Sequence, residues 1–124
     1  MHIVLFFTYD ISLKDWESSG LLDREVKLYD ELSNRECKFT FITYGNDSDL
    51  SINNLPKNIS IIPIYKYLKY SKYKSFRLLK SFIIPFKLRK VINRPDLIKT
   101  NQLNGCWIPI IYKIISRRKL IIRT

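Results

Sequence analysis

The stretch HIVLFFTY, residues 2–9, together with LLDREVKLYDEL, residues 21–32, decides the fold. The first run is rich in Val, Ile and Phe, which is typical of a strand buried on both faces of a parallel sheet. The second run places its apolar residues on one side of a helix: Leu22, Val26, Tyr29 and Leu32. The segment between them, Asp10 to Gly20, leaves a strand and opens a helix, so we expect it to line a ligand crevice. An ordinary strand-to-helix connection is the alternative.

The remainder of the chain alternates in the same way. Further strands are expected at Lys38–Tyr44, Asn58–Ile64, Leu97–Thr100 and Leu120–Arg123, with further helices at Ser75–Ile92, kinked at Pro85, and Cys106–Ser116. This order predicts an α/β fold, a doubly wound and mainly parallel sheet of about five strands with right-handed crossovers. The loops at Asp10–Gly20, Tyr44–Asp47 and Asn101–Gly105, and the one after Arg123, would then share one edge, the predicted site.

Charge is distributed unevenly along the chain. The net charge is +11, yet residues 1–50 hold ten acids and five bases, whereas residues 51–95 hold eleven bases and no acid. A two-signed chain with one basic block indicates a local basic patch on a globular body. The length of 124 residues is enough for one domain.

The basic block also carries many aromatic residues, between Tyr65 and Ile92. Lysine with interleaved Tyr and Phe is typical of a surface that lies on anionic lipid headgroups. We predict that its membrane-surface residues are Lys66, Lys69, Lys72, Lys74, Arg77 and Lys80. Within the block, the residues expected to face the sheet are Phe76, Leu79, Ile83 and Phe86, while the Tyr/Lys-rich lead-in faces outward. Nucleic-acid binding would use the same residues but lacks a recognition motif, which disfavours it.

Several kinds of chemistry are missing from the sequence. The only glycines are Gly20, Gly45 and Gly105, so there is neither a G-x-G-x-x-G fingerprint nor a Walker A motif. The one histidine, His2, begins the first strand at the edge opposite the crevice, which disfavours a serine-type triad. Two distant cysteines and this histidine do not form a zinc pattern. We therefore expect no metal and no cofactor.

Two stretches resemble the amino-terminal half of family 4 glycosyltransferases: GLLDREVKLYDELSNRECKFTFITYGNDSD, from Gly20, and DLIKTNQLNGCWIPIIYKIISRRKLIIRT, from Asp96. The resemblance covers essentially the whole chain. It rests on Trp16, Gly20, Arg24-Glu25, Thr43-Tyr44-Gly45, Asp96, Asn101-Gln102, Gly105 and the strand that ends in Arg123. It implies half of a GT-B architecture of two facing Rossmann-like domains. By resemblance, substrate binding falls to Trp16, Gly20, Asn101, Gln102 and Arg123, with Gly20 near the donor diphosphate or the acceptor.

The chain also departs from the family pattern. Family members carry the nucleotide-sugar site and a pair of glutamates in a second, carboxyl-terminal domain, whereas no glutamate follows Glu36 here. The histidine often found after the fourth strand would fall near Asn101 and is not present. We therefore expect residues 1–124 to be a single, incomplete amino-terminal domain that is inactive as a fragment.

Two functional interpretations remain open. In the first, the chain is the acceptor-side domain of an enzyme that moves a sugar from a nucleotide-sugar donor to a glycan or lipid-linked acceptor. In the second, it is a non-catalytic Rossmann-like module that binds an anionic membrane surface or another polyanion. The opening residues lack the features of a signal peptide, and no window approaches a spanning helix. We therefore expect a cytoplasmic protein, peripheral on the inner face of the plasma membrane.

Overall fold

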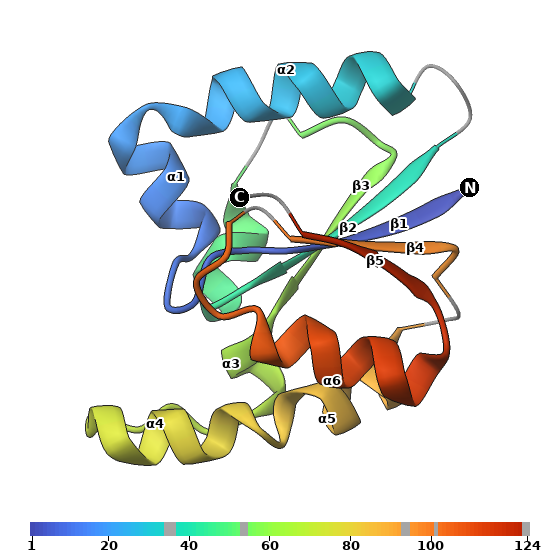
Figure 1. Cartoon of the computed structure of the whole chain (residues 1–124). Helices are drawn as coiled ribbons and strands as arrows, with labels where there is room; N and C mark the ends of the chain where they lie inside the picture. Colours follow the sequence, from blue (N-terminus) through green and yellow to red (C-terminus); the bar gives the residue numbers. More distant parts are fainter. Residues whose placement is uncertain (34–36, 53–54, 93–94, 101, 123–124) are drawn as a thin grey trace.

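The protein is described by a computed structural model that covers residues 1–33, 37–52, 55–92, 95–100 and 102–122 (Figure 1). Its strands form one five-stranded sheet in the order β3-β2-β1-β4-β5, and every neighbouring pair is parallel. The strands are β1 (His2–Phe6), β2 (Lys38–Thr43), β3 (Ile59–Pro63), β4 (Leu97–Thr100) and β5 (Lys119–Ile121). This confirms the predicted α/β, Rossmann-like fold.

Helices cover both faces of the sheet, as the crossover rule requires. They are α1 (Leu13–Ser19), α2 (Leu21–Ser33), the 3₁₀ helix η1 (Asp47–Ser51), α3 (Ile64–Tyr67), α4 (Lys74–Ser81), α5 (Ile84–Val91) and α6 (Trp107–Ser116). In Figure 1, α2 lies over one face, whereas α5 and α6 lie over the other. The two faces are therefore closed by different parts of the chain.

The core is aromatic on both sides of the sheet. Tyr29 of α2 meets Phe39 and Phe41 of β2 edge to face, at ring-centroid distances of 5.1 and 5.3 Å. On the other face, the rings of Tyr112 of α6 and Phe6 of β1 lie 5.7 Å apart. Such tilted pairs add a specific geometry to the burial of apolar area. They fix how α2 and α6 sit on the sheet.

The segment between β1 and α2 is not the open loop that the sequence predicted, because residues 13–19 form α1. Ser12 caps this helix: its Oγ accepts a hydrogen bond from the Asp15 backbone N–H at 3.1 Å, and the Asp15 carboxylate accepts one from the Ser12 N–H at 2.8 Å. This reciprocal capping box satisfies two otherwise free donors. Gly20 ends α1 in the left-handed conformation, with φ of 79°, as helices often end.

Ser75–Ile92 also differs from the prediction of one kinked helix, because it forms two helices, α4 and α5. Pro85 cannot donate an N–H within a helix interior, and it lies near the beginning of α5, after a break between α4 and α5. The expectation that Phe76, Leu79, Ile83 and Phe86 face the sheet is wrong. These side chains are 48–65% exposed. Ile84 and Leu88 of α5 and Ile108 and Tyr112 of α6 are buried instead, and they leave α4 no sheet surface to cover.

Candidate functional site

The loops that leave the strands meet at the carboxyl edge of the sheet. The Tyr44 N–H donates to the carbonyl of Ile11 at 3.0 Å, and the Tyr9 N–H donates to the carbonyl of Asn104 at 3.4 Å. The first bond joins the loops after β1 and β2, and the second joins those after β1 and β4. The loops named from the sequence are thus neighbours, apart from Asn101 and the segment after Arg123, which lie outside the described residues.

Asp49 of η1 holds this edge together from the inside. Its carboxylate is fully buried and accepts hydrogen bonds from the backbone N–H groups of Leu13 and Lys14, at 3.0 and 3.1 Å. It also accepts one from the Thr43 hydroxyl at 2.6 Å. A buried carboxylate is tolerated when such donors surround it. Asp49 therefore anchors the beginning of α1 to the end of β2.

Gly105 lies where the loop after β4 passes close to β1's loop. Its φ is 86°, in the left-handed region that glycine adopts without strain. A Cβ placed there would lie 2.7 Å from the Cβ of Tyr9. Only a residue without a side chain allows this close approach.

Tyrosine side chains line a hollow at this edge. The rings of Tyr65 and Tyr70 meet edge to face at 4.9 Å, and those of Tyr9 and Tyr44 at 5.3 Å. The hollow has a volume of about 290 Å³. Its wall consists of Ser12, Asp15, Tyr44, Gly45, Asn46, Ser48, Asp49, Tyr65 and Tyr70. Aromatic faces beside hydroxyl, amide and carboxylate groups are typical of sites for small polar ligands.

The hydroxyls of Tyr9, Tyr44 and Tyr65 remain protonated at neutral pH, because their pKa values are raised. Burial is the main cause that raises the pKa of Tyr44 well above its ordinary value, and burial with the nearby Asp10 charge raises the pKa of Tyr65 and of Tyr9. The Tyr44 hydroxyl is itself buried and has no hydrogen-bond partner among the described residues. These phenols are therefore hydrogen-bond donors, not bases.

An ion pair ties the rim of this site to α4. The Arg77 guanidinium lies 3.5 Å from the Asp10 carboxylate. It also donates to the Tyr70 hydroxyl at 2.7 Å and to the carbonyl of Ser71 at 3.2 Å. Its side chain is only 10% exposed. Arg77, which the sequence placed in the membrane-facing set, thus has a largely buried side chain whose charge is directed towards the crevice loop.

The other predicted basic residues lie on the surface. Lys66, Lys69, Lys72 and Lys74 are exposed, and Lys80 is half-buried and donates to the carbonyl of Lys69 at 3.1 Å. The Lys66 ammonium lies 5.9 Å from the centre of the Tyr67 ring. The lysines of the block therefore carry their charge outward, apart from the partial shielding of Lys80.

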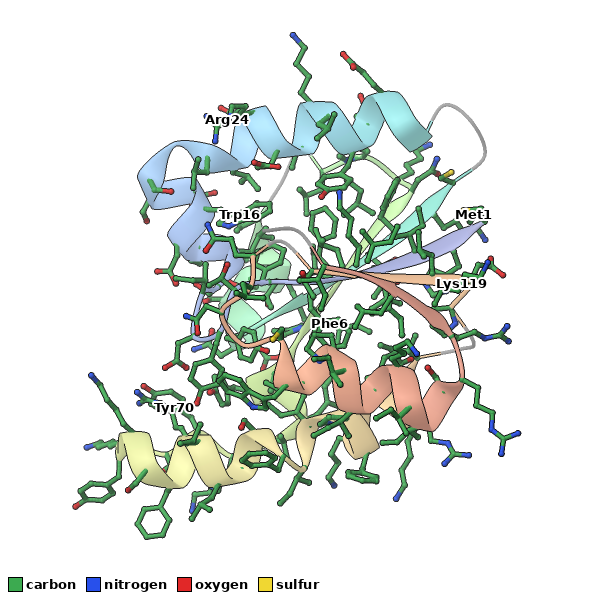
Figure 2. The ribbon with its side chains drawn as sticks, viewed as in Figure 1. Met1, Phe6, Trp16, Arg24, Tyr70 and Lys119 are labelled. Carbon is green, nitrogen blue, oxygen red and sulfur yellow. The ribbon has the colours of Figure 1, made fainter. Side chains whose placement is uncertain are left out.

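The substrate-binding residues named from the resemblance do not form one cluster. Trp16 packs in the core between α1 and the sheet (Figure 2), stacked on Phe7 at 4.1 Å and 3% exposed, so its ring does not reach solvent. Gly20 lies at the junction of α1 and α2. Gln102 does lie at the edge, where its side-chain oxygen accepts a hydrogen bond from the Thr8 hydroxyl at 3.1 Å. Asn101 and Arg123 lie outside the described residues.

Sequence reasoning missed Asp49, Tyr65 and Tyr70 as residues of this edge. The sequence predicted that Tyr65 and Tyr70 belong to the outward lead-in. The position of Tyr65, two residues after the edge strand β3, is nevertheless a signal that it lies near the carboxyl end of a strand. Asp49 gave no such signal, because an aspartate in a polar loop is usually solvated.

A second ligand hollow, a metal site and a membrane-spanning helix are the other features that the described chain could hold. Another hollow, of about 690 Å³, lies near the ends of α5 and α6 and is lined partly by Arg89, Arg117 and Arg118, away from the carboxyl edge. In the described ranges, no three His, Cys, Asp or Glu side chains gather to hold a metal ion. None of the helices described here has the length and apolarity needed to cross a membrane.

Comparisons with models of protein families, with curated proteins and with solved structures give no match for this chain. The function is therefore inferred from its residues and their geometry.

Proposed function

We propose that this chain is the acceptor-side domain of a family 4 glycosyltransferase. In this function it binds the glycan or lipid-linked acceptor, and a second domain brings the nucleotide-sugar donor. The parallel Rossmann-like sheet is the architecture that such a domain needs. The sequence resemblance from Gly20 to Asp49 and from Asp96 onward supports the same assignment.

The observation that carries the proposal is the tyrosine-lined hollow at the carboxyl edge. In open α/β sheets, ligands bind outside the carboxyl ends of the strands. A sugar ring has an apolar C–H face that suits an aromatic ring, and hydroxyls that suit neighbouring polar groups. Tyr70 is exposed and supplies such a ring. The volume lies just below the range of about 300–1,000 Å³ typical of ligand pockets, so it suits one terminal sugar of a longer acceptor.

The reaction itself needs more than acceptor binding. Transfer of a sugar from a nucleoside diphosphate requires groups that stabilise the charge developing on the leaving diphosphate and that hold donor and acceptor in line. By resemblance, the groups for the diphosphate belong to a second domain. We therefore expect the chain of residues 1–124 to bind acceptor sugars without transferring any.

Nuclear magnetic resonance of the ¹⁵N-labelled chain tests this proposal. Methyl glycosides of common hexoses and N-acetylhexosamines serve as acceptor probes, and uridine diphosphate sugars serve as donor probes. We expect at least one glycoside to shift the amide signals of Gly45, Asn46 and Tyr65, and the donor probes to leave them unchanged. Shifts from none of the glycosides, or sugar transfer by the isolated chain, would contradict the proposal.

A pair of tyrosine variants provides the matched control. Tyr70→Ala removes a ring that lines the hollow and is 55% exposed, whereas Tyr73→Ala removes a nearby ring that is 70% exposed and does not line it. We expect the first substitution to weaken glycoside binding several-fold and the second to leave it unchanged. Equal effects of the two substitutions would show that the hollow does not bind the acceptor.

The basic block favours a second candidate function, that of a module that holds an anionic membrane surface. Between residues 51 and 95 there are eleven bases and no acid, and Lys66, Lys69, Lys72 and Lys74 are exposed. Each base near such a surface contributes about 1 kcal/mol of binding free energy. Co-sedimentation with vesicles, with and without anionic lipid and at low and high salt, tests it. Equal pelleting on neutral and anionic vesicles would contradict it.

A further inference from the structure

Exposed apolar side chains follow one another along α4, the turn after it and the beginning of α5, and we call them the apolar ridge. It consists of Phe76, Leu79, Phe82, Ile83 and Phe86, which are 55, 65, 48, 48 and 56% exposed. Phe76 and Leu79 lie on α4, Phe82 and Ile83 lie in the turn that follows it, and Phe86 lies in the first turn of α5. In Figure 1, α4 extends beyond the body of the sheet, and Figure 2 shows side chains of this layer pointing away from it.

Nothing in the described chain covers this ridge. The inner side of the same layer is closed by Ile84 and Leu88, which are buried, and by the Trp107 indole N–H, which donates to the buried Ser81 hydroxyl at 3.0 Å. The ridge is therefore not the result of a loosely packed helix: the layer has a packed side and an open side. Tyr73 extends the open side, with its ring 6.0 Å from that of Phe76.

The charges around the ridge decide what kind of partner fits it. The exposed side chains that flank it include Lys72, Lys74, Lys87, Arg89 and Lys90, and residues 51–95 contain no acid. A second copy of this chain would bring the same bases against one another, because a two-fold interface pairs a patch with itself. A partner that is both anionic and apolar would pair with the flanking bases and cover the exposed apolar side chains. The interface of a bilayer with anionic headgroups is such a partner.

We propose that the apolar ridge inserts into the interface of an anionic bilayer, with the flanking lysines and arginines at the headgroups. This rests on the second candidate function above and specifies how that surface is bound: the inserted side chains come from α4 and α5, not from the Tyr/Lys-rich lead-in. The Asp10–Arg77 ion pair joins α4 to the crevice loop. A docked α4 therefore holds the crevice loop at a fixed orientation relative to the membrane surface.

Vesicle binding by three variants tests the insertion. The ridge variant carries Phe76→Ser, Leu79→Ser and Phe86→Ser; the control carries Leu28→Ser and Leu50→Ser, apolar residues that are 46 and 45% exposed outside the ridge. The charge variant carries Lys72→Glu and Lys74→Glu. On phosphatidylglycerol vesicles we expect the ridge variant to bind at least about tenfold more weakly than the unmodified chain, and the control to bind equally well.

Tryptophan quenching locates the inserted side chain directly. Phe76→Trp places a reporter on the ridge and Leu28→Trp places one on α2, and each is compared with the unmodified chain, which contains Trp16 and Trp107. Vesicles with brominated acyl chains should quench the added fluorescence of Phe76→Trp and leave that of Leu28→Trp unchanged. Circular dichroism of every variant verifies that the fold is retained.

The outcomes separate the insertion from the function on which it rests. If the charge variant loses binding while the ridge variant keeps it, the insertion is overturned and the electrostatic surface function stands. If the unmodified chain binds no anionic vesicle, both are overturned. If sedimentation shows a dimer that the ridge variant converts into monomers, the ridge is an interface between copies and the insertion is again overturned.

Discussion

The sheet body and α4 are both rich in apolar residues, but the body buries these side chains, whereas α4 leaves several of them exposed. In the body, Val4 and Phe41 are completely buried, whereas Phe76 and Leu79 of α4 are more than half exposed. The difference is one of available area, since α5 and α6 already close the sheet face on which α4 was expected to pack. Helical spacing thus defines an apolar side but not the surface that it meets.

The largest loss of stability is expected from a substitution in the sheet body. Phe41→Ala removes a ring that contacts the rings of Phe7, Trp16 and Tyr29 at 5.6, 6.1 and 5.3 Å. A cavity among large aromatic groups should lower the free energy of unfolding by about 3–5 kcal/mol. Urea denaturation measures it. A loss of unfolding free energy below about 1 kcal/mol would mean that the ring of Phe41 is not tightly packed in the body.

Asp49→Ala should have the next largest effect. The substitution leaves the Leu13 and Lys14 N–H groups and the Thr43 hydroxyl without their acceptor, which we expect to cost about 2–4 kcal/mol of unfolding free energy. Asp47→Ala, an exposed aspartate in the same 3₁₀ helix, is the matched control and should change stability by less than about 0.5 kcal/mol. Similar losses from both would show that Asp49 does not anchor the edge.

How far the sequence predicts the fold depends on the element. Leu97–Thr100 was predicted with its observed bounds, and the alternating residues of β2 identified that strand to within one residue, because period-two and buried apolar runs are local signals. The helix α1 was missed, although Ser12 and Asp15 form a capping box three residues apart. A polar composition concealed a signal that was present in the sequence.

The candidate site was less predictable than the fold. The sheet order makes the meeting of the loops at one edge foreseeable, as it was for the loop that contains Gln102. The burial of Asp49 and the inward turn of Arg77 depend on residues 36 and 67 positions away in the chain, namely Leu13 and Asp10. Spacing within a segment carries no information about such long-range pairs.

Gly20 and Gly105, the two glycines with positive φ, provide a test of how closely the loops approach each other. Gly20→Ala meets no atom within 4 Å, so only the backbone strain remains, about 1–2 kcal/mol. Gly105→Ala adds a collision with Tyr9, whose Cβ would lie 2.7 Å away, and should cost about 2–4 kcal/mol in all. Thermal or urea unfolding measures both. Equal losses would mean that the loop after β4 does not approach β1's loop closely.

Under the proposed function, a substitution of Gly20 distinguishes an effect on folding from an effect on activity. Gly20→Val should reduce activity more than stability if the backbone there passes close to a ligand, since a β-branched residue disfavours positive φ. A parent enzyme with unchanged activity would leave Gly20 as a helix-ending glycine only.

The smallest expected effect is on the ridge itself. Phe76→Ala removes an aromatic ring that is 55% exposed, and a surface substitution of this kind usually changes stability by less than about 0.5 kcal/mol. Compared with Phe41→Ala, the same chemical change should therefore differ about tenfold in its energetic cost. The comparison fails if Phe76→Ala costs more than about 2 kcal/mol, because a ring with that contribution is packed against something in solution. Repeating the urea titration at several protein concentrations then identifies the cause: a cost that grows with concentration comes from contact between copies, and a constant cost comes from α4 packing on its own chain.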